Sequence, residues 1–299
     1  MLTRRTFLKT ILVGAAGLAG LAAYPFVEVL ARPRETHYAL KPPGWTDGLK
    51  LRVCALADFH ACEPWMNLSR IKSICAKANS LDADIILLLG DYAAGTRLVS
   101  DYVHSADWSR ALASLKAPLG VHAILGNHDY WEDLAFQKDQ RSENIAANAL
   151  RNAGIATYVN ESVRLEKDGR PFWIAGLGDQ LALLPGTGYG RSSVVGIDDL
   201  PGTLAQVSDD APVLLMAHEP DIFPRVPDRV SLTLCGHTHG GQVNILGWRP
   251  AAASAGSRRY SLGQYREDNR DMIVSKGLGC SILPVRVGAW PEIVLIELG

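Results

Sequence analysis

The chain has 299 residues, of which 47% are hydrophobic, and it carries a formal net charge of −1 at pH 7. A chain of this length and composition can bury a sizeable core, and its near-neutral charge argues against nucleic acid as a partner, because nucleic-acid-binding proteins carry a clustered surplus of basic residues. Its five cysteines are scattered and form no C-x-x-C pair, so neither a zinc finger nor a disulfide framework is indicated.

The N-terminal segment, residues 1–31, has the pattern of an export signal or a membrane anchor. Residues 3–9 read Thr-Arg-Arg-Thr-Phe-Leu-Lys, and an uncharged apolar stretch follows over residues 11–27. The Arg-Arg-x-Phe-Leu-Lys run resembles the twin-arginine signal, which carries folded proteins across the bacterial inner membrane, so the twin-arginine translocase would be a partner. The alternative is an ordinary anchor whose basic flank obeys the positive-inside rule.

Both interpretations place the rest of the chain in the periplasm or at the outer face of the inner membrane. A small-residue site that ends at Ala31 leaves cleavage of the segment open.

The next segments predict a mostly parallel sheet. Residues 32–49 contain three prolines and two glycines and are expected to form an extended connector, so the folded domain is expected over residues 50–299. Apolar runs of strand length at 51–57, 85–89 and 121–125 are separated by helical patterns at 68–80 and 102–115. This alternation of strand and helix is typical of parallel sheets.

The second half of the chain predicts a further set of strands. Residues 157–177 read as short strands joined by a turn at 167–169, and buried-strand patterns return at 213–217, 231–235 and 292–298. Two sheets packed face to face, with helices outside them, would accommodate this order of elements.

Residue types that bind metals follow directly after five of the predicted strands. The motifs are Asp58-x-His60, Gly90-Asp91, Gly126-Asn127-His128-Asp129, His218-Glu219 and Gly236-His237-x-His239. A lone Asp-x-His or Gly-Asp after a strand is more often a turn or a satisfied polar residue than a metal site, and the two motifs at 126–129 and 236–239 are more specific. Together the five motifs favour a metal site, because the carboxyl ends of strands in α/β sheets are where loops from several strands converge.

This ordered set of motifs resembles the signature of the calcineurin-like metallophosphoesterase superfamily, over a stretch from about Leu51 to the C-terminus. With its twin-arginine-like start and its tail from Gly277 to Arg286, the chain is most similar to the exported or membrane-associated bacterial phosphodiesterase branch. The resemblance implies an α/β fold, a four-layer αββα sandwich of two central mixed sheets flanked by helices, with a dinuclear metal site at the C-terminal ends of strands.

The resemblance also implies which residues hold two divalent metal ions. Asp58, His60, Asp91 and His239 would hold one ion, and Asp91, Asn127, His218 and His237 the other, so that Asp91 bridges the two. Imidazole, carboxylate and amide donors suit manganese, iron or zinc. A hydroxide that bridges the ions would then attack phosphorus.

Three further residues receive roles from the resemblance. His128 would act as general acid or charge stabiliser above the phosphate, and Asp129 would fix the orientation of His128. Arg286 matches an arginine of the family and is a candidate phosphate contact, with a structural ion pair as the alternative. We therefore expect a metal-dependent phosphodiesterase whose substrate could be linked to a lipid or to the cell envelope.

Two alternatives stay open. An enzyme similar to the UDP-2,3-diacylglucosamine pyrophosphohydrolases of lipid A synthesis would keep its domain in the cytoplasm, with an uncleaved inner-membrane anchor. A non-catalytic metal-binding or cell-envelope structural protein on the same scaffold would have replaced some of the ligands or His128. Every expected position is filled in this chain, which favours the enzyme.

Overall fold

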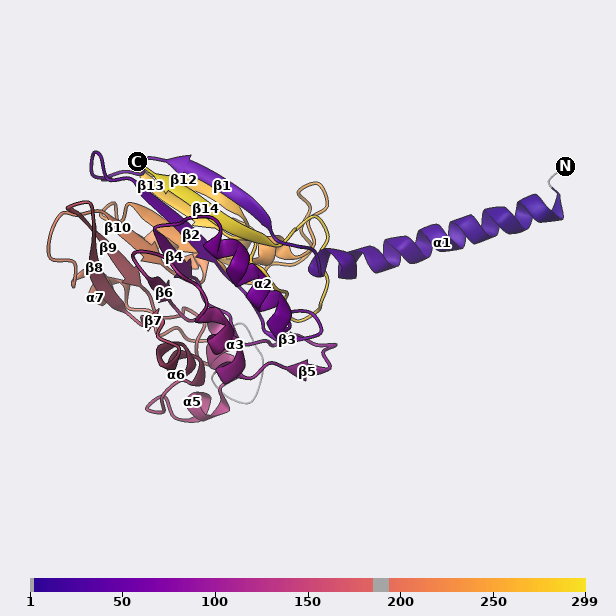
Figure 1. Ribbon diagram of the computed structural model, residues 1–299, viewed down its shortest axis with the longest axis horizontal. Coiled ribbons are helices and arrows are strands. Elements are labelled where there is room, and N and C mark those ends of the chain that lie inside the picture. Colours follow the sequence, from indigo (N-terminus) through magenta and orange to yellow (C-terminus); the bar gives the residue numbers. More distant parts are fainter. Residues whose placement is uncertain (1–2, 185–193) are drawn as a thin grey trace.

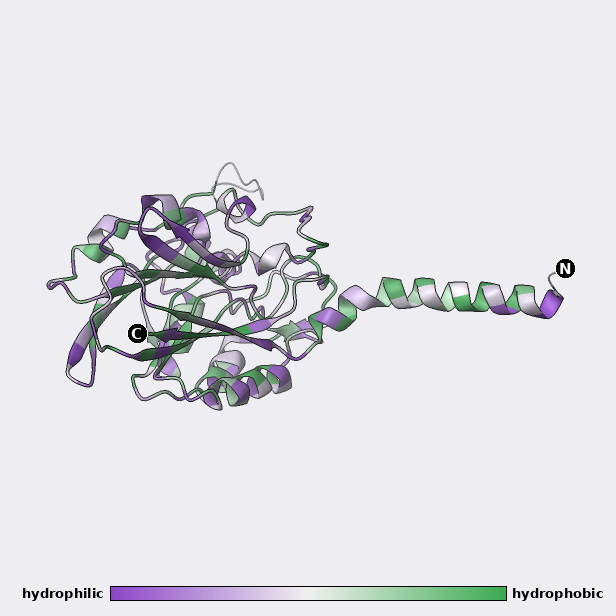
Figure 2. Ribbon diagram, turned by 90° about the horizontal axis from the view of Figure 1, so that it is seen from above, coloured by the Kyte–Doolittle hydropathy of each residue, from purple (hydrophilic) through white to green (hydrophobic). Residues whose placement is uncertain are grey.

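Two six-stranded sheets form the body of the molecule, and the long helix α1 (Arg4–Val29) projects from one end of it (Figure 1). The computed structural model describes residues 3–184 and 194–299. Helix α1 begins where the side chain of Thr3 accepts a hydrogen bond from the backbone N–H of Thr6. It is apolar along most of its length (Figure 2), and by length and composition it could cross a membrane.

The first sheet has the strand order β1-β14-β2-β4-β6-β7. Its strands are β1 (Arg34–Leu40), β14 (Glu292–Leu298), β2 (Leu51–Leu56), β4 (Ile85–Leu88), β6 (Val121–Ala123) and β7 (Ala156–Thr157). All neighbours are parallel except β14 and β2, which are antiparallel. The outer face is covered by α2 (Leu68–Asn79), α3 (Ser105–Leu112) and α6 (Ile145–Asn152).

Helix α2 illustrates why the helices lie on this face. The side chain of Asn67 accepts a hydrogen bond from the backbone N–H of Arg70 and so caps the helix start. Ile71, Ile74 and Cys75 are buried, and their spacing places them on one side of the helix. That side packs onto the sheet.

The second sheet has the strand order β12-β13-β11-β10-β9-β8. Its strands are β12 (Gly263–Glu267), β13 (Arg270–Val274), β11 (Leu232–Cys235), β10 (Val213–Met216), β9 (Arg170–Gly176) and β8 (Glu161–Lys167). The four central strands are parallel, and the two edge strands are antiparallel to their neighbours. Of the helices in the described residues, the short α7 (Leu200–Leu204), η1 (Pro220–Arg225) and η3 (Gly256–Arg258) lie outside it.

The two sheets pack face to face, because successive residues of a strand point to opposite faces. In β2, Cys54 and Leu56 belong to the core beneath the helices, whereas Val53 and Ala55 belong to the core between the sheets. A third core lies on the outer face of the second sheet. The predicted four-layer αββα sandwich is thereby confirmed.

The structure differs from the expected extended connector over residues 32–49. Residues Arg34–Leu40 form the edge strand β1, paired in parallel with β14, and the side chains of Trp45 and Leu49 are buried between the sheets. The pattern of β1 is weak because its side chains are only partly buried or exposed and most of them are polar. The folded domain therefore begins before the expected boundary. Strands β12 and β13 were also not predicted.

Candidate metal centre

The loops after β2, β4, β6, β10 and β11 place the five motifs together at one end of the two sheets. Their backbone is unusual: Asp58, His60, Asp91, His237 and His239 all have positive φ, between 47° and 68°. L-residues other than glycine rarely adopt this left-handed conformation, and it concentrates at functional sites. These turns direct the side chains back over the strand ends.

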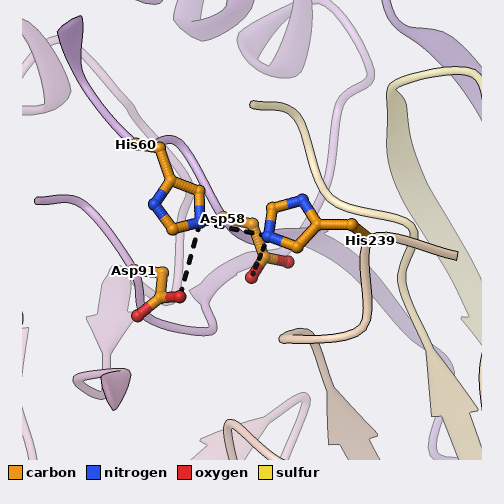
Figure 3. A group of neighbouring side chains, drawn as sticks. All are labelled: Asp58, His60, Asp91 and His239. Atoms are coloured by element: carbon orange, nitrogen blue, oxygen red, sulfur yellow. Dashed lines mark hydrogen bonds and ion pairs between the residues drawn. The ribbon is translucent and has the colours of Figure 1, made fainter. Parts of the chain in front are cut away.

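The first group of candidate ligands is Asp58, His60, Asp91 and His239, whose ligand atoms all lie within 4.8 Å of one another (Figure 3). His60 Nε2 lies 3.4 Å from Asp91 Oδ2 and 3.1 Å from His239 Nε2. His239 Nε2 lies 3.7 Å from Asp58 Oδ1. All four side chains are buried. They converge from three loops, because Asp58 and His60 lie in the same loop after β2.

The second group shares Asp91 with the first and adds His218 and His237. His218 Nε2 lies 3.2 Å from Asp91 Oδ2. Asn127 joins this group, because its Oδ1 lies 2.9 Å from His237 Nδ1. Asp91 is thus the residue common to both groups, as expected for a bridging carboxylate. The structure brings together all seven side chains that were expected to hold metals.

Backbone carbonyls fix two of the imidazole rings. His218 Nδ1 donates to the carbonyl oxygen of Leu89 at 2.6 Å, and His60 Nδ1 donates to that of Ala93 at 3.1 Å. A carbonyl oxygen can only accept, so each ring carries its proton on Nδ1 when neutral and presents a lone pair on Nε2. Such outer partners commonly orient metal-binding histidines.

Burial keeps most of these rings neutral. It lowers the pKa of His60 to about 3, and it lowers the pKa values of His237 and His239 well below the usual range. Neutral imidazole is the form that binds metals. Burial, with the charge of Asp91 adding to it, raises the pKa of Asp58 to about 7. Two buried carboxylates at close range are costly unless a positive charge offsets them.

The residues fit a pair of divalent cations. His237 Nε2 is buried without a hydrogen-bond partner among the described residues, and an unsatisfied buried polar atom is costly. The donor set of imidazole, carboxylate and amide groups is typical of transition-metal sites. The cluster is therefore a plausible dinuclear ligand set, with the identity of the metals left open by the donor chemistry.

His128 lies beside this cluster on α4 (Asn127–Trp131). Its ring packs edge-on to that of His60, with centroids 4.9 Å apart. His128 Nε2 lies 3.1 Å from Ser281 Oγ, and Nδ1 lies 3.4 Å from Glu132 Oε1. Burial disfavours the imidazolium, but the charges of Asp91 and Glu132 outweigh it and raise the pKa of His128.

Asp129 does not contact the ring of His128, contrary to the expectation that it orients this residue. Its carboxylate instead accepts hydrogen bonds from the backbone N–H groups of Asp91, Tyr92, Ala93 and Gly126, at 2.9 to 3.0 Å. Adjacent residues of a helix point in different directions, whereas residues four apart share a face. Glu132, four residues after His128, is therefore the carboxylate that meets the ring, and this spacing was visible in the sequence.

Arg286 is fully buried behind His239, and its contacts match neither the expected phosphate contact nor the alternative ion pair. Its guanidinium donates to the backbone carbonyls of Lys276, Gly279 and Ala289. Its Nη2 also lies 3.3 Å from His239 Nδ1, the ring nitrogen that faces away from the ligand cluster. The position of this arginine supports the C-terminal loop and His239 from behind.

Sequence reasoning missed a buried acidic pair next to the second ligand group. Ligand atoms of Asp179 and Glu219 lie within 4.8 Å of one of His218. Burial, and then the charge of the neighbouring carboxylate Glu219, raises the pKa of Asp179 well above its usual range. Glu219 was visible beside His218, but Asp179 follows β9 in a stretch without a recognisable motif.

Comparisons with known proteins agree with this geometry. The model of the calcineurin-like phosphoesterase family matches residues 51–241. The uncharacterized metallophosphoesterase YkuE of Bacillus subtilis is 28% identical over 306 residues, which cover 99% of this chain and 98% of YkuE. The phosphodiesterase YaeI of Escherichia coli is 26% identical and covers 100% of both chains.

A third relative is named as a transmembrane protein. The transmembrane protein with metallophosphoesterase domain of Danio rerio is 26% identical over 287 residues, which cover 94% of this chain and 60% of that protein. The match of the family model over more than half of the chain shows that the chain belongs to the calcineurin-like phosphoesterase family.

Proposed function

We propose that this member of the family is a phosphodiesterase that hydrolyses phosphate diesters at the outer face of a membrane. The observation that carries the proposal is the position of Asp91, which is shared by two buried ligand groups at the ends of two sheets. Membership of the family supports a metal-dependent phosphoesterase, and the name of the relative YaeI supports a diester as substrate.

The proposed ligands are those expected from the sequence. Asp58, His60, Asp91 and His239 hold one ion, and Asp91, Asn127, His218 and His237 hold the other, with manganese, iron or zinc as the candidate metals. When bound, such a pair neutralises charge on the phosphate oxygens and lowers the pKa of water.

His128 is proposed as the proton donor to the departing oxygen. Its Nε2 is already within hydrogen-bond distance of a hydroxyl, that of Ser281, which shows that an oxygen can reach this nitrogen. Glu132 accepts from Nδ1 on the opposite side of the ring and favours the protonated imidazole. Asp129 is proposed to act indirectly. Its carboxylate accepts a hydrogen bond from the backbone N–H of Asp91 and so holds the loop that carries this ligand.

A diester suits this arrangement better than a monoester. A monoester dianion depends on cationic side chains to neutralise its charge, and the expected candidate, Arg286, is buried behind His239. A diester carries a single negative charge and benefits more from a proton supplied to its leaving alkoxide. His128 offers that proton.

Helix α1 is proposed to remain attached as an anchor. The buried carboxylate of Glu28 accepts hydrogen bonds from the backbone N–H groups of Gly288 and Ala289 at 3.0 and 2.8 Å. The carbonyl of Pro25 accepts from the N–H of Arg286 at 3.1 Å. Cleavage after Ala31 would remove both contacts. We therefore propose residues 1–31 as the signal and anchor, and residues 32–299 as the catalytic domain.

The test is a metal-dependent assay of the purified full-length protein. Bis(p-nitrophenyl) phosphate and p-nitrophenyl phosphate would be compared before chelation, after removal of bound metal, and after addition of manganese. We expect the activity to vanish with the metal, to return with manganese, and to be higher on the diester. Full activity in protein shown to be free of metal would overturn the mechanism, and faster turnover of the monoester would overturn the substrate class.

A further inference from the structure

Three loops of the domain carry exposed apolar side chains close together. We call them the apolar rim; its members are Leu98, Tyr102, Ile245, Leu246, Trp248, Ile282 and Leu283. Leu246 is fully exposed, and the side chains of Leu98 and Trp248 are 67% and 63% exposed. Elsewhere beyond Leu30, the large apolar side chains that are exposed in the described residues are scattered singly. A cluster of this kind marks an interaction surface.

The rim borders the metal centre. Its loops continue from the ligands: Leu98 lies seven residues after Asp91, and Leu246 lies seven residues after His239. Ser281, which contacts His128, directly precedes Ile282 in the third loop.

Hydrogen bonds join the three loops to one another. The N–H of Arg97 donates to the carbonyl of Ile282 at 2.7 Å. The side-chain amide of Gln242 donates to the carbonyl of Leu283 at 3.2 Å and accepts from the N–H of Ser281 at 2.6 Å. The apolar tips and the catalytic side chains therefore belong to one connected structure.

Helix α1 ends at the same rim. The ring of Phe26 lies 5.9 Å from that of Trp65, and Trp65 Nε1 donates to the carbonyl of Leu98 at 2.8 Å. Figure 1 shows α1 leaving the domain at the end where β3 (Cys62–Glu63) and β5 (Asp101–Tyr102) lie. Its 26 residues span about 39 Å, which exceeds the hydrocarbon thickness of about 30 Å. A bilayer crossed by α1 would lie next to this end of the domain.

We infer that the apolar rim rests on the bilayer surface and that the site takes phosphodiesters of membrane lipids. The inference rests on the proposed phosphodiesterase function and names its substrate class. Tryptophan and tyrosine prefer the membrane interface, and the exposed Arg97 and Arg249, next in sequence to Leu98 and Trp248, suit the lipid phosphates. Because α1 would hold this end of the domain against a bilayer, we favour lipid over a protein as the partner that contacts the rim.

The reaction on such a lipid is balanced by water alone. The bond between phosphorus and the oxygen of the leaving alcohol breaks, and the hydroxyl of water takes its place on phosphorus. The remaining hydrogen of water ends on the departing oxygen, so that an alcohol and a phosphomonoester are formed. No oxidant or reductant is needed.

The first experiment uses the full-length protein in nanodiscs of phosphatidylcholine that contain a head-group-labelled phosphatidylglycerol. The rim variant carries Leu98→Ser, Leu246→Ser and Trp248→Ser. The control variant carries Leu134→Ser and Ile145→Ser, two side chains that are 79% and 52% exposed and lie outside the rim. Bis(p-nitrophenyl) phosphate is assayed in parallel as a soluble diester.

We expect the rim variant to lose at least about tenfold in kcat/KM on the labelled lipid, because three apolar side chains no longer enter the interface. Its rate on the soluble diester should stay at the wild-type level, which also shows that it folds. The control variant should match the wild type on both substrates.

A second measurement follows the rim without using activity. The five native cysteines are buried, so a fluorescent thiol label at Leu246→Cys would be selective. Quenchers carried by the lipids should quench this label strongly and should leave the same label at Leu134→Cys nearly unaffected.

Other results would overturn the inference. These are equal lipid turnover by the rim variant and the wild type, or equal quenching at positions 246 and 134. Wild-type protein that cleaves the soluble diester but no lipid would overturn the substrate class and leave the phosphodiesterase function standing. Failure on both substrates with metal present would overturn the proposed function itself.

Discussion

The loops that follow β4 and β11 differ sharply between their base and their tip. At the base, Asp91 and His239 are buried, polar and held in a left-handed backbone conformation. At the tip, Leu98 and Leu246 are apolar and exposed. The base is constrained by the strands, by the left-handed turns and by the carbonyls that orient the rings, so it can define a reaction. The tips share the left-handed conformation, with φ of 58° at Leu98 and 51° at Leu246, but their apolar side chains are exposed and can meet a surface outside the protein, so the tips can define where the reaction takes place.

The largest expected effect comes from the base, at Asp91. Asp91→Asn should lower both metal content and activity, because this one change weakens both metal sites. Loss of a residue that only orients a ligand typically costs roughly 10- to 100-fold, and the loss at Asp91 should exceed that range. Metal analysis and kcat on the soluble diester check this. His104→Ala, at the cap of α3, is a matched control that should leave both unchanged. Metal content near the wild-type level in Asp91→Asn would argue against a bridge.

The next effect concerns His128, which is proposed to move a proton and not to hold metal. His128→Ala should slow diesters with alkyl leaving groups by about 10²- to 10⁴-fold, as expected for loss of a general acid. It should slow aryl diesters much less, because their leaving groups need no proton. Metal content should stay near that of the wild type. Equal losses on alkyl and aryl substrates would contradict the role of proton donor.

A smaller effect is expected at Glu132, which is partly exposed and lies 3.4 Å from His128 Nδ1. Exposed ion pairs contribute up to about 1 kcal/mol, so Glu132→Gln should reduce the rate on alkyl diesters by about fivefold or less. The same substitution should leave the rate on aryl diesters unchanged. A loss larger than that of His128→Ala would show that Glu132 acts on something other than this ring.

Glu28 tests the junction between α1 and the domain. Glu28→Ala leaves two backbone N–H groups without their acceptor, which should cost about 1 to 3 kcal/mol of stability if they remain buried. Chemical unfolding of the full-length protein measures the loss, and kcat on the soluble diester should be close to that of the wild type. A variant as stable as the wild type would indicate that the end of α1 is not docked in solution.

The smallest effect on catalysis is expected at the twin-arginine pair. Replacing Arg4 and Arg5 by lysines keeps the positive charge but removes the proposed twin-arginine signal, so we expect export to fail while the activity of the protein is retained. Fractionation of cells, followed by an assay of each fraction, checks this. Unchanged localisation of the double-lysine variant would favour the ordinary anchor.

Much of the metal centre could be predicted from the sequence, because its ligands directly follow strongly apolar strands. A continuous apolar run such as 85–88 identifies the strand, and Asp91 then lies at its carboxyl end. The roles of Asp129 and Arg286 could not be predicted in this way. Asp129 is turned towards the backbone of residues 91–93 by the local geometry of a single helical turn. Arg286 points behind His239 because its loop folds back onto α1.

The edge strands are the part of the fold that patterns do not predict. Strand β1 alternates between exposed and half-buried side chains, so its apolar signal is diluted. Only its pairing with β14, which lies more than 250 residues later, identifies it as a strand. The apolar rim could not be predicted from the sequence either. Single apolar residues in separate loops indicate no surface patch until the fold brings the loops together.

The position of β14 has a consequence for the order of events during synthesis. This last strand of the chain lies between β1 and β2, the first two strands, and pairs with both. The first sheet therefore stays split until β14 has been synthesised, although β1 and β2 precede it by more than 230 residues. Long-range pairing of this kind is slow, and unpaired strand edges are prone to aggregate. A nascent chain of this design therefore benefits from protection by a chaperone until β14 has paired.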